Sequence, residues 1–249
     1  MDPYLLFFLI ALVSLGASCT QSVTGFGYGI VAMIFLPSLL LYTEANLLSS
    51  ILSTLTSLFS MILTFRKVNW KNLLFPVLGS TVTNYFAVTF IKTQKNEVLL
   101  LLLGVALVIL SLYFFFFSNK IKIKPTPLAG LIAGIISGVM SGMFSIGGPP
   151  VVIYYMQSER EPDRYLSTIS AYFVLSGIVS IGMKLFSGFA TPNVWIGFAV
   201  GLVGMLLGAL IGNFARSKIK PQAVKRAVYG VMAISGVINV ITSALSLAG

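Results

Sequence analysis

The feature that most restricts the fold of this chain is a series of long apolar segments in which charged residues are rare. Of its 249 residues, 57% are hydrophobic and only 9% are charged, which is too little charge to cover the surface of a water-soluble domain of this size. An uncharged apolar run of about 18 residues or more is long enough to cross the hydrocarbon core of a bilayer. The sequence therefore predicts an all-α polytopic membrane protein that forms a single membrane domain.

The apolar segments fall into two similar series. The segments expected in the membrane are 5–24, 30–42, 47–65, 73–91 and 98–117 in the first series, and 128–141, 151–156, 165–186, 194–214 and 227–247 in the second. Gly27 and Gly147 hold matching places 120 residues apart, and the only two tryptophans, Trp70 and Trp195, do so 125 residues apart. We therefore predict two repeats, 1–118 and 128–249, joined by a cytoplasmic linker at 119–127, with eight to ten membrane helices in total.

The lysines and arginines between the segments predict how the repeats are oriented. If the first two segments of each repeat enter and leave the membrane on one side, thirteen cations gather on one side and three, Lys92, Lys95 and Lys184, on the other. If each such pair crosses only once, the division is nine to seven. The positive-inside rule favours the first arrangement, which places both termini outside, on the periplasmic side, and inverts the second repeat relative to the first. Membrane orientation, rather than nucleic-acid binding, then explains the net charge of +10.

A cluster of small, polar and helix-breaking residues interrupts the first pair of segments in each repeat, at 21–29 and at 141–150. Glycine and proline leave backbone N–H and C=O groups without helical partners, which a bilayer tolerates only where that backbone is buried in protein or lines a cavity. The second broken pair has about 28 apolar residues, fewer than the roughly 40 that two full crossings need. We therefore expect its turn to lie within the membrane and to meet the turn of the first pair near the midplane, where broken helices of transporters bind substrate.

The chemistry expected at this meeting point is that of an anion site built from neutral donors. No acidic or basic residue lies in the middle of an expected span, whereas helices expected to start at Gly29 and Pro150 would direct free N–H groups toward an anion. The candidate substrate-binding residues are Gln21, Ser22, Thr24, Gly25, Gly27, Gly29, Ser141, Ser145, Gly147, Gly148, Pro149 and Pro150. For any single glycine, close packing of helices is the alternative role.

The sequence predicts no catalytic residue, no metal site and no cofactor. The chain has no histidine, which excludes His-dependent triads and HExxH metal sites, and no carboxylate pair is expected at membrane depth. The phosphate-binding motif G-x-x-x-x-G-K-[ST] is absent from the chain, so it is not by itself an ATP-driven pump. The expected partners are a small anionic substrate and membrane lipid, without nucleic acid, and the sequence also allows a homodimer.

The two clusters carry a family resemblance. The run from Thr24 to Gly29, Thr-Gly-Phe-Gly-Tyr-Gly with Pro37 after it, and its counterpart from Ser145 to Pro150, Ser-Ile-Gly-Gly-Pro-Pro, resemble the glycine-rich motifs of the sulfite exporter TauE/SafE family of membrane transporters. The resemblance covers essentially the whole chain. It implies export of sulfite or small organosulfonates from the bacterial cytoplasm, and it carries over to the glycines at 25, 27, 29, 147 and 148 and to the prolines at 149 and 150.

These observations together predict a secondary transporter that exports a small sulfur-containing anion, sulfite or an organosulfonate such as sulfoacetate, across the bacterial inner membrane. At an inside-negative potential an anion leaves downhill, by about 2.3 kcal/mol per charge per 100 mV. Two alternatives remain open from the sequence. One is a passive anion channel of the same fold, and the other is a membrane receptor or assembly factor that transports nothing.

Overall fold

A computed structural model describes residues 2–117, 123–215 and 221–248 of the chain. In this part of the chain the regular structure is helical throughout, and eight helices are long and apolar enough to cross a membrane. The α-helices are α1 (Pro3–Thr24), α2 (Tyr28–Phe35), α3 (Tyr42–Thr64), α4 (Leu74–Lys92), α5 (Asn96–Phe117), α6 (Pro127–Phe144), α7 (Gly148–Ser158), α8 (Pro162–Phe186), α9 (Pro192–Ala215) and α10 (Pro221–Ala248). Short 3-10 turns occupy Leu36–Ser38, Phe65–Lys67 and Trp70–Asn72. The prediction of an all-α polytopic membrane protein is confirmed.

Prolines and capping side chains set where several helices begin. Pro3 and Pro127 occupy the first turns of α1 and α6, where a missing N–H costs no helical hydrogen bond, and the side chains of Asp2 and Thr126 cap these two helices. In α7, Pro149 also lies in the first turn, so the helix begins at Gly148 and not at Pro150 as the sequence had suggested.

Other expected boundaries also move. In the first half, α2 begins at Tyr28 rather than Gly29 and is shorter than the expected segment 30–42, because a 3-10 turn follows it and Tyr42 already belongs to α3. Of the predicted linker 119–127, residues 119–122 lie outside the described part of the chain, and α6 already begins at Pro127.

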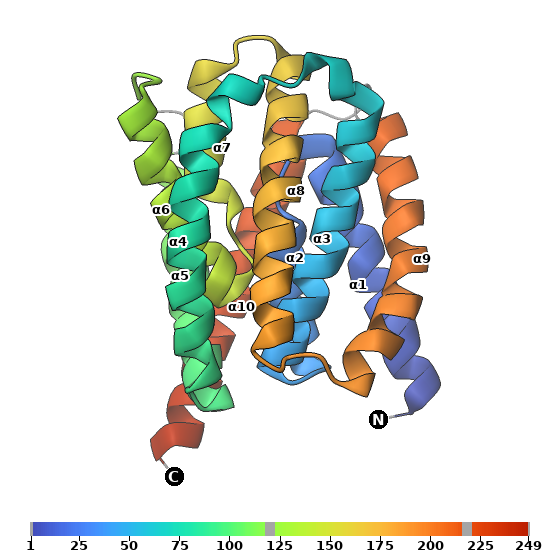
Figure 1. Cartoon of the computed structure of the whole chain (residues 1–249). Helices are drawn as coiled ribbons and strands as arrows, with labels where there is room; N and C mark the ends of the chain where they lie inside the picture. Colours follow the sequence, from blue (N-terminus) through green and yellow to red (C-terminus); the bar gives the residue numbers. More distant parts are fainter. Residues whose placement is uncertain (1, 118–122, 216–220, 249) are drawn as a thin grey trace.

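Helices of the two halves pack against one another in a reciprocal pattern. The α1 helix lies along α9 and α4 lies along α6, while α3 packs on α8 and α5 on α10. Several boundaries of equivalent helices lie 120 residues apart, since α1 and α6 end at Thr24 and Phe144 and α3 and α8 begin at Tyr42 and Pro162. Both termini lie at the same end of the bundle (Figure 1). The inversion of one repeat relative to the other and the membrane face that each end occupies stay predictions.

Glycines allow the closest of these helix contacts. A Cβ atom at Gly204 of α9 would overlap the backbone carbonyl of Ala11 in α1, and a Cβ atom at Gly134 of α6 would overlap the backbone of Pro76 in α4. Small residues let membrane helices approach until their backbones touch, which maximises packing where lipid gives no hydrophobic drive. The packing role therefore holds for these glycines.

Two buried carboxylates join the halves at opposite ends of the bundle. Glu44, at the start of α3, accepts hydrogen bonds from Thr191 Oγ1 at 2.6 Å, in the connection between α8 and α9, and from Asn193 Nδ2 at 3.2 Å, in the first turn of α9. Glu159, after α7, accepts from the side-chain amides of Asn69 and Asn72 at 2.7 and 2.6 Å, in the connection between α3 and α4. These connections are visible at the lower and upper ends of the bundle (Figure 1). Charge-assisted hydrogen bonds therefore link the two halves at both ends of the bundle.

Replacing Gly204 with valine is expected to destabilise the α1–α9 contact. The added side chain meets rigid backbone rather than a movable side chain, so the cost is at least about 1–3 kcal/mol, as for other overpacked interiors. The control is Gly16→Val on α1, where an added Cβ would have no neighbour within 4 Å. The apparent melting temperature in detergent should fall for Gly204→Val only. Equal melting temperatures for both variants would show that the close contact does not stabilise the fold.

Candidate functional site

Each broken helix pair turns at a residue with left-handed backbone. The α1 helix ends at Gly25 with φ 84°, and its N–H donates to Gln21 O at 2.7 Å. The α6 helix ends at Ser145 with φ 56°, and its N–H donates to Ser141 O at 2.9 Å. Glycine adopts this conformation without cost, whereas for serine it is strained. Among the described residues Ser145 is the only non-glycine residue with positive φ. The strained backbone of this turn therefore distinguishes Ser145 from the other serines.

The two turns touch each other. A Cβ atom at Gly29, in the first turn of α2, would overlap the backbone carbonyl of Ser145. In the opposite direction, a Cβ atom at Gly148 would lie 3.1 Å from the Phe26 ring. At Gly29 only glycine lets the two backbones approach this closely, whereas at Gly148 a larger residue would crowd the Phe26 ring. The turns, which are about 120 residues apart in sequence, therefore form one structural unit.

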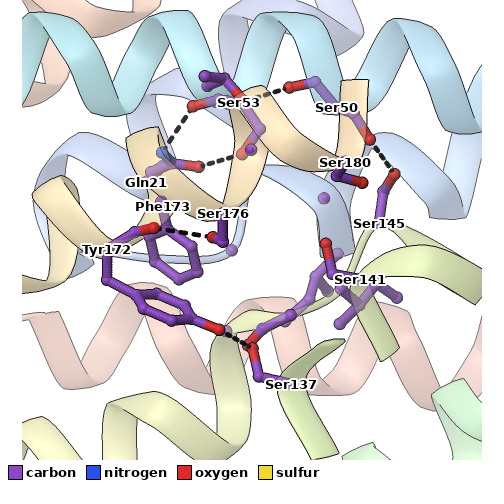
Figure 2. Close-up of a pocket in the computed structure, with 18 residues that line it drawn as sticks. Gln21, Ser50, Ser53, Ser137, Ser141, Ser145, Tyr172, Phe173, Ser176 and Ser180 are labelled. Carbon is purple, nitrogen blue, oxygen red and sulfur yellow. Dashed lines mark hydrogen bonds between the residues drawn. The ribbon is translucent and has the colours of Figure 1, made fainter. Parts of the chain in front are cut away.

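A polar cavity lies against this unit (Figure 2). Its volume is about 40 Å³, counted as the space open to the centres of water-sized spheres, so it is large enough to hold water. The two broken helix pairs form part of its wall, and α3 and α8 supply the rest. The lining residues are Gln21, Gly27, Gly29, Ile30, Ser50, Ser53, Thr54, Ser137, Ser141, Ser145, Ile146, Gly147, Gly148, Tyr172, Phe173, Ser176, Gly177 and Ser180.

The structure brings seven of the twelve candidate residues to this cavity and leaves five away from it. Those that line it are Gln21, Gly27, Gly29, Ser141, Ser145, Gly147 and Gly148. Ser22 and Gly25 instead line a smaller neighbouring space with Ser60, Thr64 and Asn213. The Thr24 hydroxyl is bonded to backbone carbonyls of its own turn, and Pro149 and Pro150 belong to the first turn of α7 without reaching the cavity. Substrate binding by the seven stays a prediction.

The lining residues that sequence reasoning missed include Ser137 of α6 and Tyr172 of α8, and above all a set of hydroxyl residues on α3 and α8. Ser50, Ser53 and Thr54 come from α3, and Ser176 and Ser180 come from α8. A signal was present, because polar or small residues three and four positions apart mark one face of a helix even inside an apolar span. Helical spacing alone does not reveal whether that face meets a cavity or another helix.

Side-chain hydrogen bonds fix most of the cavity wall. Gln21 Nε2 donates to Ser57 Oγ at 2.6 Å, and Ser53 Oγ donates to Gln21 Oε1 at 3.1 Å. On the far side, the Tyr172 hydroxyl donates to Ser137 Oγ at 2.8 Å, and Ser137 in turn donates to the Gly147 carbonyl (Figure 2). These bonds hold polar groups in place around the empty space before any solute arrives.

Ser180 is the exception among these polar groups. Its side chain is buried, with 1% of its surface exposed, and within the described part of the chain its hydroxyl has no hydrogen-bond partner. A buried hydroxyl without a partner costs about 1–3 kcal/mol. Because Ser180 lies in the cavity wall (Figure 2), a solute that accepts or donates a hydrogen bond there would remove this cost.

Lys184 corrects the expectation that the site contains no buried ionic side chain. It was counted among the cations on the outer side, near the end of the expected span 165–186; it does lie in the last turn of α8, but its side chain is completely buried. Its ammonium donates to Ser50 Oγ at 2.6 Å, Ser145 Oγ at 3.2 Å and the Ser141 carbonyl at 3.3 Å. All three acceptors belong to residues that line the cavity.

The starts of two helices add further donors. Neither α2 nor α7 has a side chain that caps its first turn. The first N–H groups of a helix have no acceptor within the helix, and the helix dipole makes this end favourable for negative charge. Glycines at both helix starts line the cavity, but α7 contributes fewer backbone donors than α2, because Pro149 and Pro150 in its first turn have no N–H.

Two broken helix pairs that meet at a polar cavity, inside a bundle of apolar helices, define a membrane transport protein. The chain belongs to the sulfite exporter TauE/SafE family, whose model matches residues 10–238. It is also similar to a probable sulfite/organosulfonate exporter TauE of Cupriavidus necator, with 23% identity over 224 residues and 85% of each chain covered. No solved structure matches the chain. The resemblance inferred from the two clusters is thereby confirmed.

The contact between the turns predicts the effect of Gly29→Ala. The new methyl group would push the Ser145 carbonyl away and separate the two turns, so sulfite uptake into inverted membrane vesicles should fall at least tenfold. Gly230→Ala on α10 is the matched control, because an added Cβ there has no neighbour within 4 Å. Wild-type uptake by Gly29→Ala would mean that the close approach of the turns is dispensable.

Proposed function

We propose that this protein is a secondary transporter that exports sulfite or a small organosulfonate such as sulfoacetate across the bacterial inner membrane, and that the anion binds in the central cavity. The observation that carries the proposal is the convergence of both broken helix pairs on one small polar space. Broken helices present unpaired backbone groups to a solute, and in transporters such sites lie between the two halves that move. Family membership supports export of a sulfur-containing anion at the level of the family.

The cavity suits an oxyanion better than a cation. Hydroxyl and backbone N–H donors border it, whereas the described carboxylates nearest to the interface, Glu44 and Glu159, bind partners at the ends of the bundle. A tetrahedral or pyramidal sulfur oxyanion accepts several hydrogen bonds at once, so it matches a wall with donors on different sides. The cavity is small, which favours a compact headgroup.

The geometry also suggests how the site opens to one face at a time. Glu44 and Glu159 each bind a connection of the opposite half, one at each end. If the halves rock about the central cavity, one of these networks breaks while the other holds. We propose that access alternates in this way, with the broken pairs carrying the anion between the two open states.

A ligand screen tests the substrate class. Purified protein in detergent is expected to gain thermal stability with sulfite or sulfoacetate, because a ligand that binds only the folded state stabilises it. Sulfate, thiosulfate and taurine serve as comparison solutes. Stabilisation by none of the five would remove sulfur anions as the substrate.

Transport is tested with Gly147→Leu. Gly147 lines the cavity, and a Cβ atom added there would lie 2.9 Å from the Ser141 side chain. A leucine side chain would therefore occupy the part of the cavity in which we propose that the anion binds. Uptake of sulfite into inverted vesicles should be abolished, whereas Gly182→Leu on α8, where a Cβ meets nothing within 4 Å, should transport normally. A carrier should show uptake that saturates with sulfite concentration and that is coupled to exchange of sulfite across the membrane, whereas a channel should show neither. If wild-type proteoliposomes show no flux, a receptor or assembly factor is favoured instead.

A further inference from the structure

Lys184 turns away from the nearest end of its helix and into the protein. It lies two residues before the end of α8, where Phe186 is 95% exposed, yet none of the Lys184 side chain is exposed. A lysine so near a helix end normally extends its flexible stem and places its charge in water. The opposite direction taken here means that the surrounding groups hold the ammonium inside.

No carboxylate neutralises this charge in the described part of the chain. The ion pairs found there join Lys67 with Glu161 and Asp163, and Arg164 with Glu159. The three donors of the Lys184 ammonium are instead satisfied by two serine hydroxyls and one backbone carbonyl, all neutral. In its protonated form Lys184 therefore places an uncompensated positive charge next to the cavity.

An unpaired buried charge of this kind raises the free energy of the folded protein, which indicates that it has a functional role. Desolvation of an ammonium is recovered only when an opposite charge comes close, and ionisable groups inside membrane proteins usually mark the path of a substrate or ion. An anionic solute in the adjoining cavity would supply the opposite charge that the described residues around Lys184 lack.

The hydroxyls between Lys184 and the cavity connect the two. Ser50 and Ser145 both accept from the ammonium and both line the cavity. Both hydroxyls also donate to the Asn46 carbonyl, at 2.9 and 2.8 Å, so an anion in the cavity would replace this carbonyl as their acceptor. Ser180, which has no partner in the described part of the chain, lies one helical turn before Lys184 on the same face of α8. Three hydroxyls therefore border the cavity beside one cation, and of these the Ser180 hydroxyl has no partner in the described part of the chain.

We infer that Lys184 is the residue that selects for negative charge in the central cavity, through the hydroxyls of Ser50 and Ser145. This inference rests on the proposed function in that the cavity is taken as the transport site. As a consequence, the site would discriminate among sulfur-containing solutes by their charge. Sulfoacetate and sulfite, which carry only negative charge, are favoured, whereas taurine, a zwitterion whose own ammonium is repelled by Lys184, is disfavoured.

The test measures binding of sulfite, sulfoacetate and taurine to purified Lys184→Met, Lys184→Gln and Lys184→Arg. Loss of the charge in the first two variants should weaken sulfite and sulfoacetate binding at least tenfold and bring the preference for sulfoacetate over taurine close to one. Arginine keeps the charge, so Lys184→Arg should retain the wild-type preference. Lys92→Met, which removes an exposed lysine at the end of α4, is the matched control and should bind as wild type does.

The melting temperatures of the same variants show whether each variant is still folded. Methionine in place of a buried charge removes a desolvation cost, so the melting temperature of ligand-free Lys184→Met should equal or exceed that of the wild type. If wild-type protein binds sulfite or sulfoacetate and Lys184→Met and Lys184→Gln bind them equally well with unchanged preference over taurine, the role of Lys184 is overturned and the proposed function stands. If wild-type protein binds neither anion, the proposed function and the role of Lys184 fall together.

Discussion

The structure depends on one constraint, namely that backbone N–H and C=O groups need hydrogen-bond partners where no water can supply them. Inside a bilayer the α-helix meets this need within each segment, which is why the described part of the chain is almost entirely helical. The two breaks, between α1 and α2 and between α6 and α7, are the exceptions. They are tolerated because they are buried against each other, with glycine at the points of contact.

Contact between the breaks has a further effect on the rest of the bundle. Since each break belongs to a different half, the halves are joined at their centre, and α3 and α8 pack against each other beside the joined turns. Their serine-bearing faces then complete the wall around the cavity. An environment rich in hydroxyls arises at the centre of an apolar protein without any acidic residue in the wall.

Lys184 sets the electrostatic balance of this environment. An anion hydrogen-bonded to Ser50 or Ser145 would lie roughly 5 Å from the ammonium, two hydrogen-bond lengths away. At an effective dielectric constant of about 20, the attraction at that distance is about 3 kcal/mol, whereas burying an anion costs several kcal/mol. If the cavity is the transport site, charge and hydroxyls together would offset part of the cost of burying an anion without binding it too tightly for release.

The sequence by itself determined the class of protein, the places of most helices and the two breaks, because hydropathy, segment length and the conformations of glycine and proline are local properties. It also indicated seven of the residues that line the cavity. Only the tertiary structure decided that Gly29 meets Ser145, that serines of α3 and α8 complete the wall, and that Lys184 points inward. Near the end of a helix a lysine has water and protein within equal reach, and the neighbouring helices alone decide between them.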